Sequence, residues 1–203
     1  MSRHVRKLAV GLGVLSLGLW FLAAGGQGVA DDKADVRAAV QKVADAVEKG
    51  DADTAKKLAE EIAKDQELEN VMYLMKKRDS KGKAKGYFGV GKQPGAIKPD
   101  GIEDKTQNLG KRPLEQKQLD KESDALAEMA YRIAAIAEIA KAKPGEKADN
   151  DKKKKEWAEY AETMRKEADA LADAAKTKKP AEIKAAANKI YSTCNNCHGS
   201  FRD

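Results

Sequence analysis

The chain has 203 residues, of which 41% are hydrophobic, 35% charged and only 5% aromatic, and this length suits one domain behind a short leader. The formal net charge is +6, but residues 1–30 hold three of the 39 basic side chains and no acidic one. If this segment is removed, the net charge is +3, which does not indicate nucleic-acid binding.

Residues 1–30 are typical of a secretory signal peptide. Arg3, Arg6 and Lys7 form a basic start, residues 8–24 are apolar, and residues 28–30 are small and precede two aspartates. The alternative is an uncleaved membrane anchor, which needs about 20 apolar residues. The run is shorter than that and three glycines interrupt it, so cleavage is favoured. We therefore predict export to the periplasm and a single domain over residues 31–203.

The abundance of Ala, Lys and Glu and the lack of strand alternation predict an all-α fold. The first expected helix covers residues 32–49, with four valines on one face, and Gly50 ends it. A second helix begins after Asp51 or Asp53. Its apolar positions shift phase at the polar stretch 64–67. This shift predicts a kink, or a division into two helices, before the segment that contains Met72 and Met75.

Residues 78–113 are rich in Gly, Lys and Pro and predict a long loop. Loops of this length in compact domains are usually functional or disordered. The segment 86–91 superficially resembles a phosphate-binding loop, but it lacks the preceding strand and the following helix. A lid in which Tyr87 and Phe88 touch a bound cofactor is an alternative, but we expect a solvated loop.

Helical periodicity returns at residue 114 and predicts helices at 114–142 and about 152–176. Pro180 then starts a last helix, at a position where proline is tolerated. Its inner stripe continues at steps of three and four residues into two cysteines and a histidine: Ile183, Ala187, Ile190, Cys194, Cys197 and His198. We therefore expect both thiols and the imidazole on the helix face that points into the core.

Cys194, Cys197 and His198 form the pattern C-x-x-C-H, the attachment motif of c-type haem. Each thiol would form a thioether with the haem, and the histidine would ligate its iron. A redox disulfide is disfavoured because no βαβ pattern surrounds the pair. A structural zinc site is disfavoured because it needs four ligands and the second histidine is His4. We predict one covalently bound haem c.

With this motif in its last helix, the chain resembles the class II c-type cytochromes, the cytochrome c′ family. The resemblance also rests on Phe201 and Arg202 after the motif, and on the pattern of Trp157 and Leu171 in the preceding helix. It extends over residues 114–202. It implies a four-helix bundle of the cytochrome c′ type, here with an extra N-terminal helix and a long Gly/Lys-rich loop.

The resemblance also implies the surroundings of the iron. Met72 stands where the family places the second iron ligand, with Met75 one turn further on. For both methionines, plain core packing is the alternative, which would leave an open or otherwise filled iron site. Arg202 would lie near a haem propionate, and a solvated charge at the C-terminus is the alternative reading of this residue.

These observations predict a periplasmic monohaem cytochrome that carries electrons and is not an enzyme. The alternative function is a five-coordinate protein that binds a diatomic gas such as nitric oxide. We expect transient redox partners, which lysines 152–155 would steer if those partners are acidic. We expect no nucleic acid and no stable membrane insertion after signal cleavage. The resemblance implies a homodimer as one assembly.

Overall fold

Helices account for all of the regular structure in the part of the chain that the computed structural model describes, residues 28–78 and 87–202. Before the long loop lie α1 (Gly28–Glu48), α2 (Ala52–Asp65) and α3 (Leu68–Tyr73). After it lie α4 (Ile102–Lys111), α5 (Gln116–Ala142), α6 (Asp151–Lys176) and α7 (Pro180–Phe201). The predicted all-α fold is confirmed.

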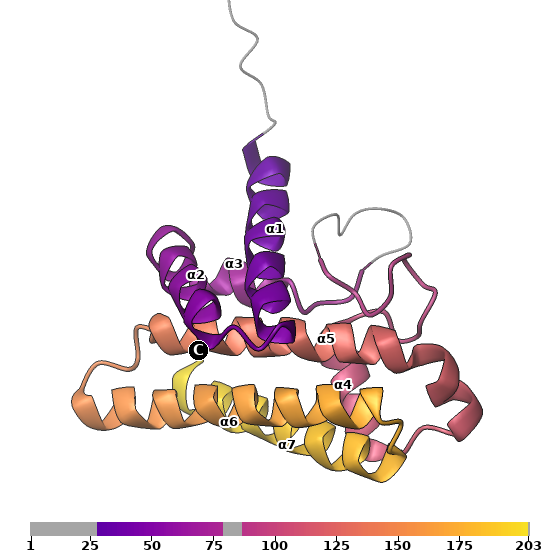
Figure 1. Cartoon of the computed structure of the whole chain (residues 1–203). Coiled ribbons are helices and arrows are strands. Elements are labelled where there is room, and N and C mark those ends of the chain that lie inside the picture. The colour runs from indigo at the N-terminus through magenta and orange to yellow at the C-terminus, as the bar shows by residue number, and fades with distance from the viewer. Residues whose placement is uncertain (1–27, 79–86, 203) are drawn as a thin grey trace, which may run out of the picture.

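The four helices α4 to α7 form a bundle in which α5 packs along α6, α6 along α7, and α7 along α4 (Figure 1). Local signals set the helix ends. The side chain of Asn150 accepts a hydrogen bond from the Lys153 backbone N–H and caps α6. Pro180 lies in the first turn of α7, as predicted. Backbone N–H groups in the first turn have no partner within the helix, so proline, which lacks the N–H, costs no hydrogen bond there.

α1 and α2 form a second layer on the side of α5 that faces away from α6 and α7 (Figure 1). The helices separate where expected, at Gly50, whose positive φ of 71° suits glycine. The four predicted valines of α1 are at most 7% exposed: Val36, Val40, Val43 and Val47. Because helices cover α5 from two sides, every residue between 129 and 137 is buried.

The predicted loop 78–113 contains a helix that the sequence pattern did not reveal. α4 fills residues 102–111 and supplies the fourth helix of the bundle, and α1 to α3 precede it in the chain. Its inner face is occupied by Ile102, Lys105, Thr106 and Leu109. The spacing is helical, but two of the four positions are polar, and this hid the amphipathic pattern.

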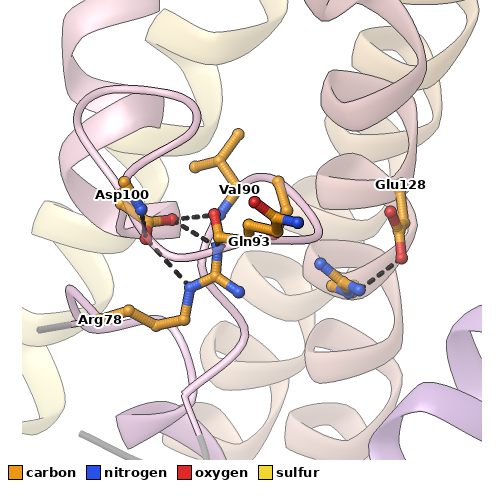
Figure 2. A network of polar contacts seen from close by, with 8 residues as sticks. Arg78, Val90, Gln93, Asp100 and Glu128 are labelled. Atoms are coloured by element: carbon orange, nitrogen blue, oxygen red, sulfur yellow. Dashed lines mark hydrogen bonds and ion pairs between the residues drawn. The ribbon is translucent and has the colours of Figure 1, made fainter. Parts of the chain in front are cut away.

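Most of the apolar residues between α3 and α4 are packed, so the expectation of a solvated loop is wrong for them. Phe88 and Val90 are at most 1% exposed. The Arg78 guanidinium and the Asp100 carboxylate form a buried ion pair that ties the two ends of the loop together (Figure 2). The two partners are 22 positions apart in the sequence, so local pattern reading could not reveal the pair.

Phe88 packs beneath the N-terminal layer. The guanidinium of Arg132 on α5 lies 4.7 Å from the centre of its ring, and that of Arg37 on α1 lies 5.8 Å from it. These are cation–π distances. Burial lowers the pKa of Arg132, and the carboxylate of Glu128 opposes that effect. The loop thus joins α1 to α5.

The predicted signal peptide, residues 1–30, lies outside the described residues except for its last three, which begin α1. Among residues 28–78 and 87–202, no helix combines the length and the apolar character that a membrane span requires.

A buried ion pair fastens α4 to α5 and offers a test of this arrangement. Lys105 is 2% exposed, and its Nζ lies 2.6 Å from Glu122 Oε2 and 3.2 Å from the Lys98 carbonyl. Lys105→Met should cost about 3 kcal/mol or more of unfolding free energy, because it leaves the Glu122 carboxylate without its cation.

Lys141→Met is the matched control, because Lys141 and Glu162 form an exposed pair (45% and 59%). Its loss should cost less than about 1 kcal/mol. Urea unfolding followed by circular dichroism measures both changes. Equal losses would show that Lys105 does not anchor α4.

Candidate haem-attachment site

The C-terminal half of α7 carries the two thiols of the predicted motif. Ile183, Ala187 and Ile190 point into the bundle, each at most 2% exposed. Cys194 and Cys197 continue this face, and both are half-buried free thiols. The predicted inward orientation therefore applies to the cysteines.

The two thiols lie in different apolar surroundings. Cys194 packs against the large apolar core that the helices share, which we call the main core. Cys197 packs against a small cluster formed by Ala140, Ala148 and Trp157, which we call the end cluster. Burial raises the pKa of Cys194 to about 12 and that of Cys197 to about 11. At neutral pH both thiols are therefore protonated, as suits groups that face apolar surfaces.

The end cluster closes this end of the bundle. Trp157 Nε1 donates a hydrogen bond to the Ala140 carbonyl at 2.6 Å, which satisfies the polar atom of a buried indole. The ring of Phe201 stands edge-on to Trp157, with 5.2 Å between ring centres. Phe201 also packs on the cluster. The motif helix thus ends with Phe201 packed against the aromatic rings of Trp157 and Tyr160 on α6.

His198 differs from the prediction because it is exposed and does not point into the core. The pKa of its imidazole is lowered, first by partial burial and then by the charge of Arg202, while Glu103 opposes the shift. Among the described residues, no hydrogen bond engages the ring. A neutral imidazole with an open nitrogen is the form that binds a metal.

α4 runs antiparallel along the motif helix. A Cβ at Gly110 would lie 2.9 Å from the Cα of Asn188, so the two helices touch there. One turn further, Gln107 Nε2 donates to the Tyr191 hydroxyl at 2.5 Å. Continued by another turn, this pairing places Glu103 opposite the motif, where its charge acts on both Cys194 and His198.

Glu103 was missed in the sequence because α4 itself was missed. The signal that could have found it is the spacing of Ile102, Lys105, Thr106 and Leu109, which is helical when polar residues are accepted on the inner face.

The structure places Met72 beside the motif, although the two lie far apart in the sequence. Met72 on α3 packs both on the main core and on the end cluster, where Cys197 also packs. Met75 packs on the main core alone, and its carbonyl accepts a hydrogen bond from the Glu103 N–H at 3.1 Å. Of the two methionines, Met72 therefore shares surroundings with a motif cysteine.

Arg202 ends α7. Its backbone N–H donates to the His198 carbonyl at 3.0 Å, and its own carbonyl accepts from Lys147 Nζ at 3.2 Å. The side chain is exposed, and its charge reaches His198. This position suits either alternative, a contact with a propionate or a solvated charge.

The residues present fit a covalently attached haem. Two uncharged thiols lie one helical turn apart, an imidazole follows them directly, and apolar side chains from α3 and α6 line the neighbourhood. A structural zinc site needs a larger set of ligands. Within residues 28–78 and 87–202, no group of three His, Cys, Asp or Glu side chains is placed so that it could bind one metal ion.

Comparison with known proteins agrees with this geometry. The family model described as Cytochrome C′ matches residues 102–202, which are the residues from the start of α4 to the end of α7. No curated protein and no solved structure matches the chain.

The burial of the thiols predicts slow chemistry in a haem-free chain. Thiolate is the reactive form of cysteine, and at pH 8 the raised pKa values of Cys194 and Cys197 keep both thiols protonated. A chain made without residues 1–30 and without haem should react with iodoacetamide at least about tenfold more slowly when folded than in concentrated urea. Mass spectrometry measures the rates, and circular dichroism confirms that the helices are present. Similar rates in both solutions would show that this face of α7 is open.

Proposed function

The chain belongs to the cytochrome c′ family and is a c-type cytochrome. From this premise we propose that it is an exported, periplasmic protein with one haem c, and that it carries electrons. The observation that supports this proposal most directly is the position of Cys194, Cys197 and His198 on the last helix of the bundle, with both thiols directed inward.

Three of the chain's own residues would hold the cofactor. Cys194 and Cys197 would each add the sulfur and hydrogen of their thiol across a vinyl double bond, so that no atom would be lost. His198 would supply a nitrogen ligand from the exposed end of α7. When bound, the haem supplies an iron that changes between ferrous and ferric states. Two covalent bonds keep such a group in place in either state.

Met72 is the proposed second iron ligand. It is held on α3 against the same end cluster as Cys197. A thioether ligand raises the reduction potential and suits electron transfer. Arg202 is proposed to pair with a haem propionate, because its charge lies close to His198.

The gas-binding alternative has one specific observation in its favour. The family match begins at α4, and the buried side chains of that helix are Ile102, Lys105, Thr106 and Leu109. None of them is a usual haem ligand at neutral pH, and Met72 lies outside the matched residues. If Met72 does not ligate, a five-coordinate iron would bind a small diatomic gas.

A carrier is proposed in preference to an enzyme. The sequence has two histidines, and His4 lies in the predicted signal segment, so no second imidazole is available to assist oxygen chemistry. Contacts with redox partners would be small and transient. The lysines at 152–155, at the start of α6, would steer acidic partners in a salt-dependent manner. The homodimer implied by the resemblance remains a proposal.

Absorption spectra and mass spectrometry test the proposal on the exported protein. The mass should equal that of the processed polypeptide plus one haem. The reduced spectrum should be low-spin and should change only slowly under carbon monoxide, because Met72 would have to leave the iron before the gas could bind. A mass equal to the bare polypeptide would overturn the haem proposal. High-spin iron that binds carbon monoxide at once would replace the carrier by the gas-binding alternative.

Met72→Ala identifies the second ligand. We expect it to convert low-spin iron to high-spin iron that binds carbon monoxide, because a methyl group cannot replace a thioether sulfur. Met75→Ala is the matched control, since Met75 packs on the main core, and it should leave the spin state unchanged. If neither variant changes the spectrum of a low-spin protein, neither methionine is the ligand.

A further inference from the structure

A buried ion pair in the loop between α3 and α4 belongs to a network of hydrogen bonds with several backbone groups. Arg78 Nε lies 3.1 Å from Asp100 Oδ2, and Arg78 Nη2 lies 2.8 Å from Asp100 Oδ1 (Figure 2). The same Nη2 donates to the carbonyls of Gly91 and Gln93. The carboxylate also accepts the backbone N–H groups of Val90 and Gly95. We call this network the clasp.

The acid–base state of the clasp follows from these contacts. Burial alone would raise the pKa of Asp100, but hydrogen bonds from Arg78 and from two backbone N–H groups outweigh it and lower the pKa. The pair is therefore ionised throughout the physiological range. Arg78 is 8% exposed and Asp100 is 4% exposed, so water competes weakly for their charges.

The clasp joins the end of α3 to the start of α4. The Arg78 N–H donates to the Asp100 carbonyl at 2.8 Å, and the Glu103 N–H donates to the Met75 carbonyl at 3.1 Å. A Cβ at Gly101 would lie 2.8 Å from the Cα of Lys77, so the two segments touch. Residues 72–78 and 100–103 thus form one folded unit, which we call the elbow.

The elbow reaches the surroundings of the motif at both of its ends. Met72 packs on the same end cluster as Cys197. Glu103 lies in the first turn of α4, the helix that packs along α7.

Energetic considerations indicate a role in positioning. A buried ion pair is often no more stabilising than apolar residues of the same volume, and one use of such a pair is to fix a single arrangement. A bidentate Arg–carboxylate pair also fixes direction, because its two parallel hydrogen bonds allow little rotation. The clasp meets both criteria and acts on a unit whose Met72 packs on the same cluster as Cys197.

We infer that Arg78 and Asp100 are positioning residues of the proposed haem site: they hold the elbow, and with it Met72, at the end cluster on which Cys197 packs, and so would control the access of small ligands to a haem attached there. This inference rests on the proposed function. It assigns a role to residues outside the family-matched range 102–202.

Arg78→Lys in the haem-loaded protein tests the inference. Lysine keeps the charge but loses the two-pronged geometry. Arg165→Lys is the matched control, because Arg165 pairs with Glu138 and links α6 to α5 inside the bundle. Loss of one charge-assisted hydrogen bond should raise the open population, and hence the association rate of carbon monoxide with the ferrous protein, by about tenfold. The control should change this rate less than about twofold.

Hydrogen exchange of the Phe88 and Glu103 amides gives a readout that does not depend on the iron. These amides donate to the carbonyls of Leu74 and Met75, just after α3, and not to the clasp itself. They should exchange faster in Arg78→Lys and at the control rate in Arg165→Lys. Faster exchange with an unchanged carbon monoxide rate would overturn the inference, because the clasp would then serve the loop alone. Unchanged exchange would overturn it as well.

Asp100→Asn is the second variant, since it keeps the side-chain volume and removes the charge, and it should reproduce both effects. The wild-type protein provides a test without substitution. In urea below the unfolding transition, Glu103 exchange and the carbon monoxide rate should rise with the same dependence on urea. Different dependences would overturn the inference even if both variants fail to fold. A protein that carries no haem would overturn the proposed function as well, which separates the two failures.

Discussion

The direction of one helix face governs this structure. On α7 the stripe that packs into the bundle and the stripe that carries the two thiols are the same stripe, because both follow steps of three and four residues. Any group attached to Cys194 and Cys197 therefore has to lie where helices already meet. Three other features matter because of where they lie relative to that face: α4 along the motif, the end cluster around Trp157, and the elbow that carries Met72.

The sequence predicted the C-terminal half well, and for a physical reason. α5, α6 and α7 bury apolar side chains at regular spacing, so periodicity alone located them, and Pro180 and Gly50 marked helix ends by their backbone preferences. The same logic located the two thiols. It misjudged His198, which follows Cys194 by four residues and so shares its side of the helix, but which lies in the last turn of α7 and is exposed there.

The middle of the chain could not be predicted because its order depends on charges that act over long sequence separations. Lys105 occupies a core position of α4 only because Glu122 on α5 meets it. Arg78 and Asp100 make hydrogen bonds to the backbone of residues 90–95, a segment with few apolar residues of its own. Neither pair produces a local pattern. The approach of Met72 to Cys197 is a third case, since it depends on how α3 is placed against the end cluster.

The burial of α5 has a consequence for how the chain could be shortened. Residues 102–202 hold the whole family-matched bundle, and within that bundle α5 packs mainly on α6. If α1 and α2 were deleted, the face of α5 that they cover would be left bare. The residues buried between 129 and 137 are mostly alanine, isoleucine and methionine, with Arg132 among them, and exposed apolar strips of that kind promote self-association. The N-terminal helices therefore cover a face that the matched bundle alone would offer to a neighbouring molecule.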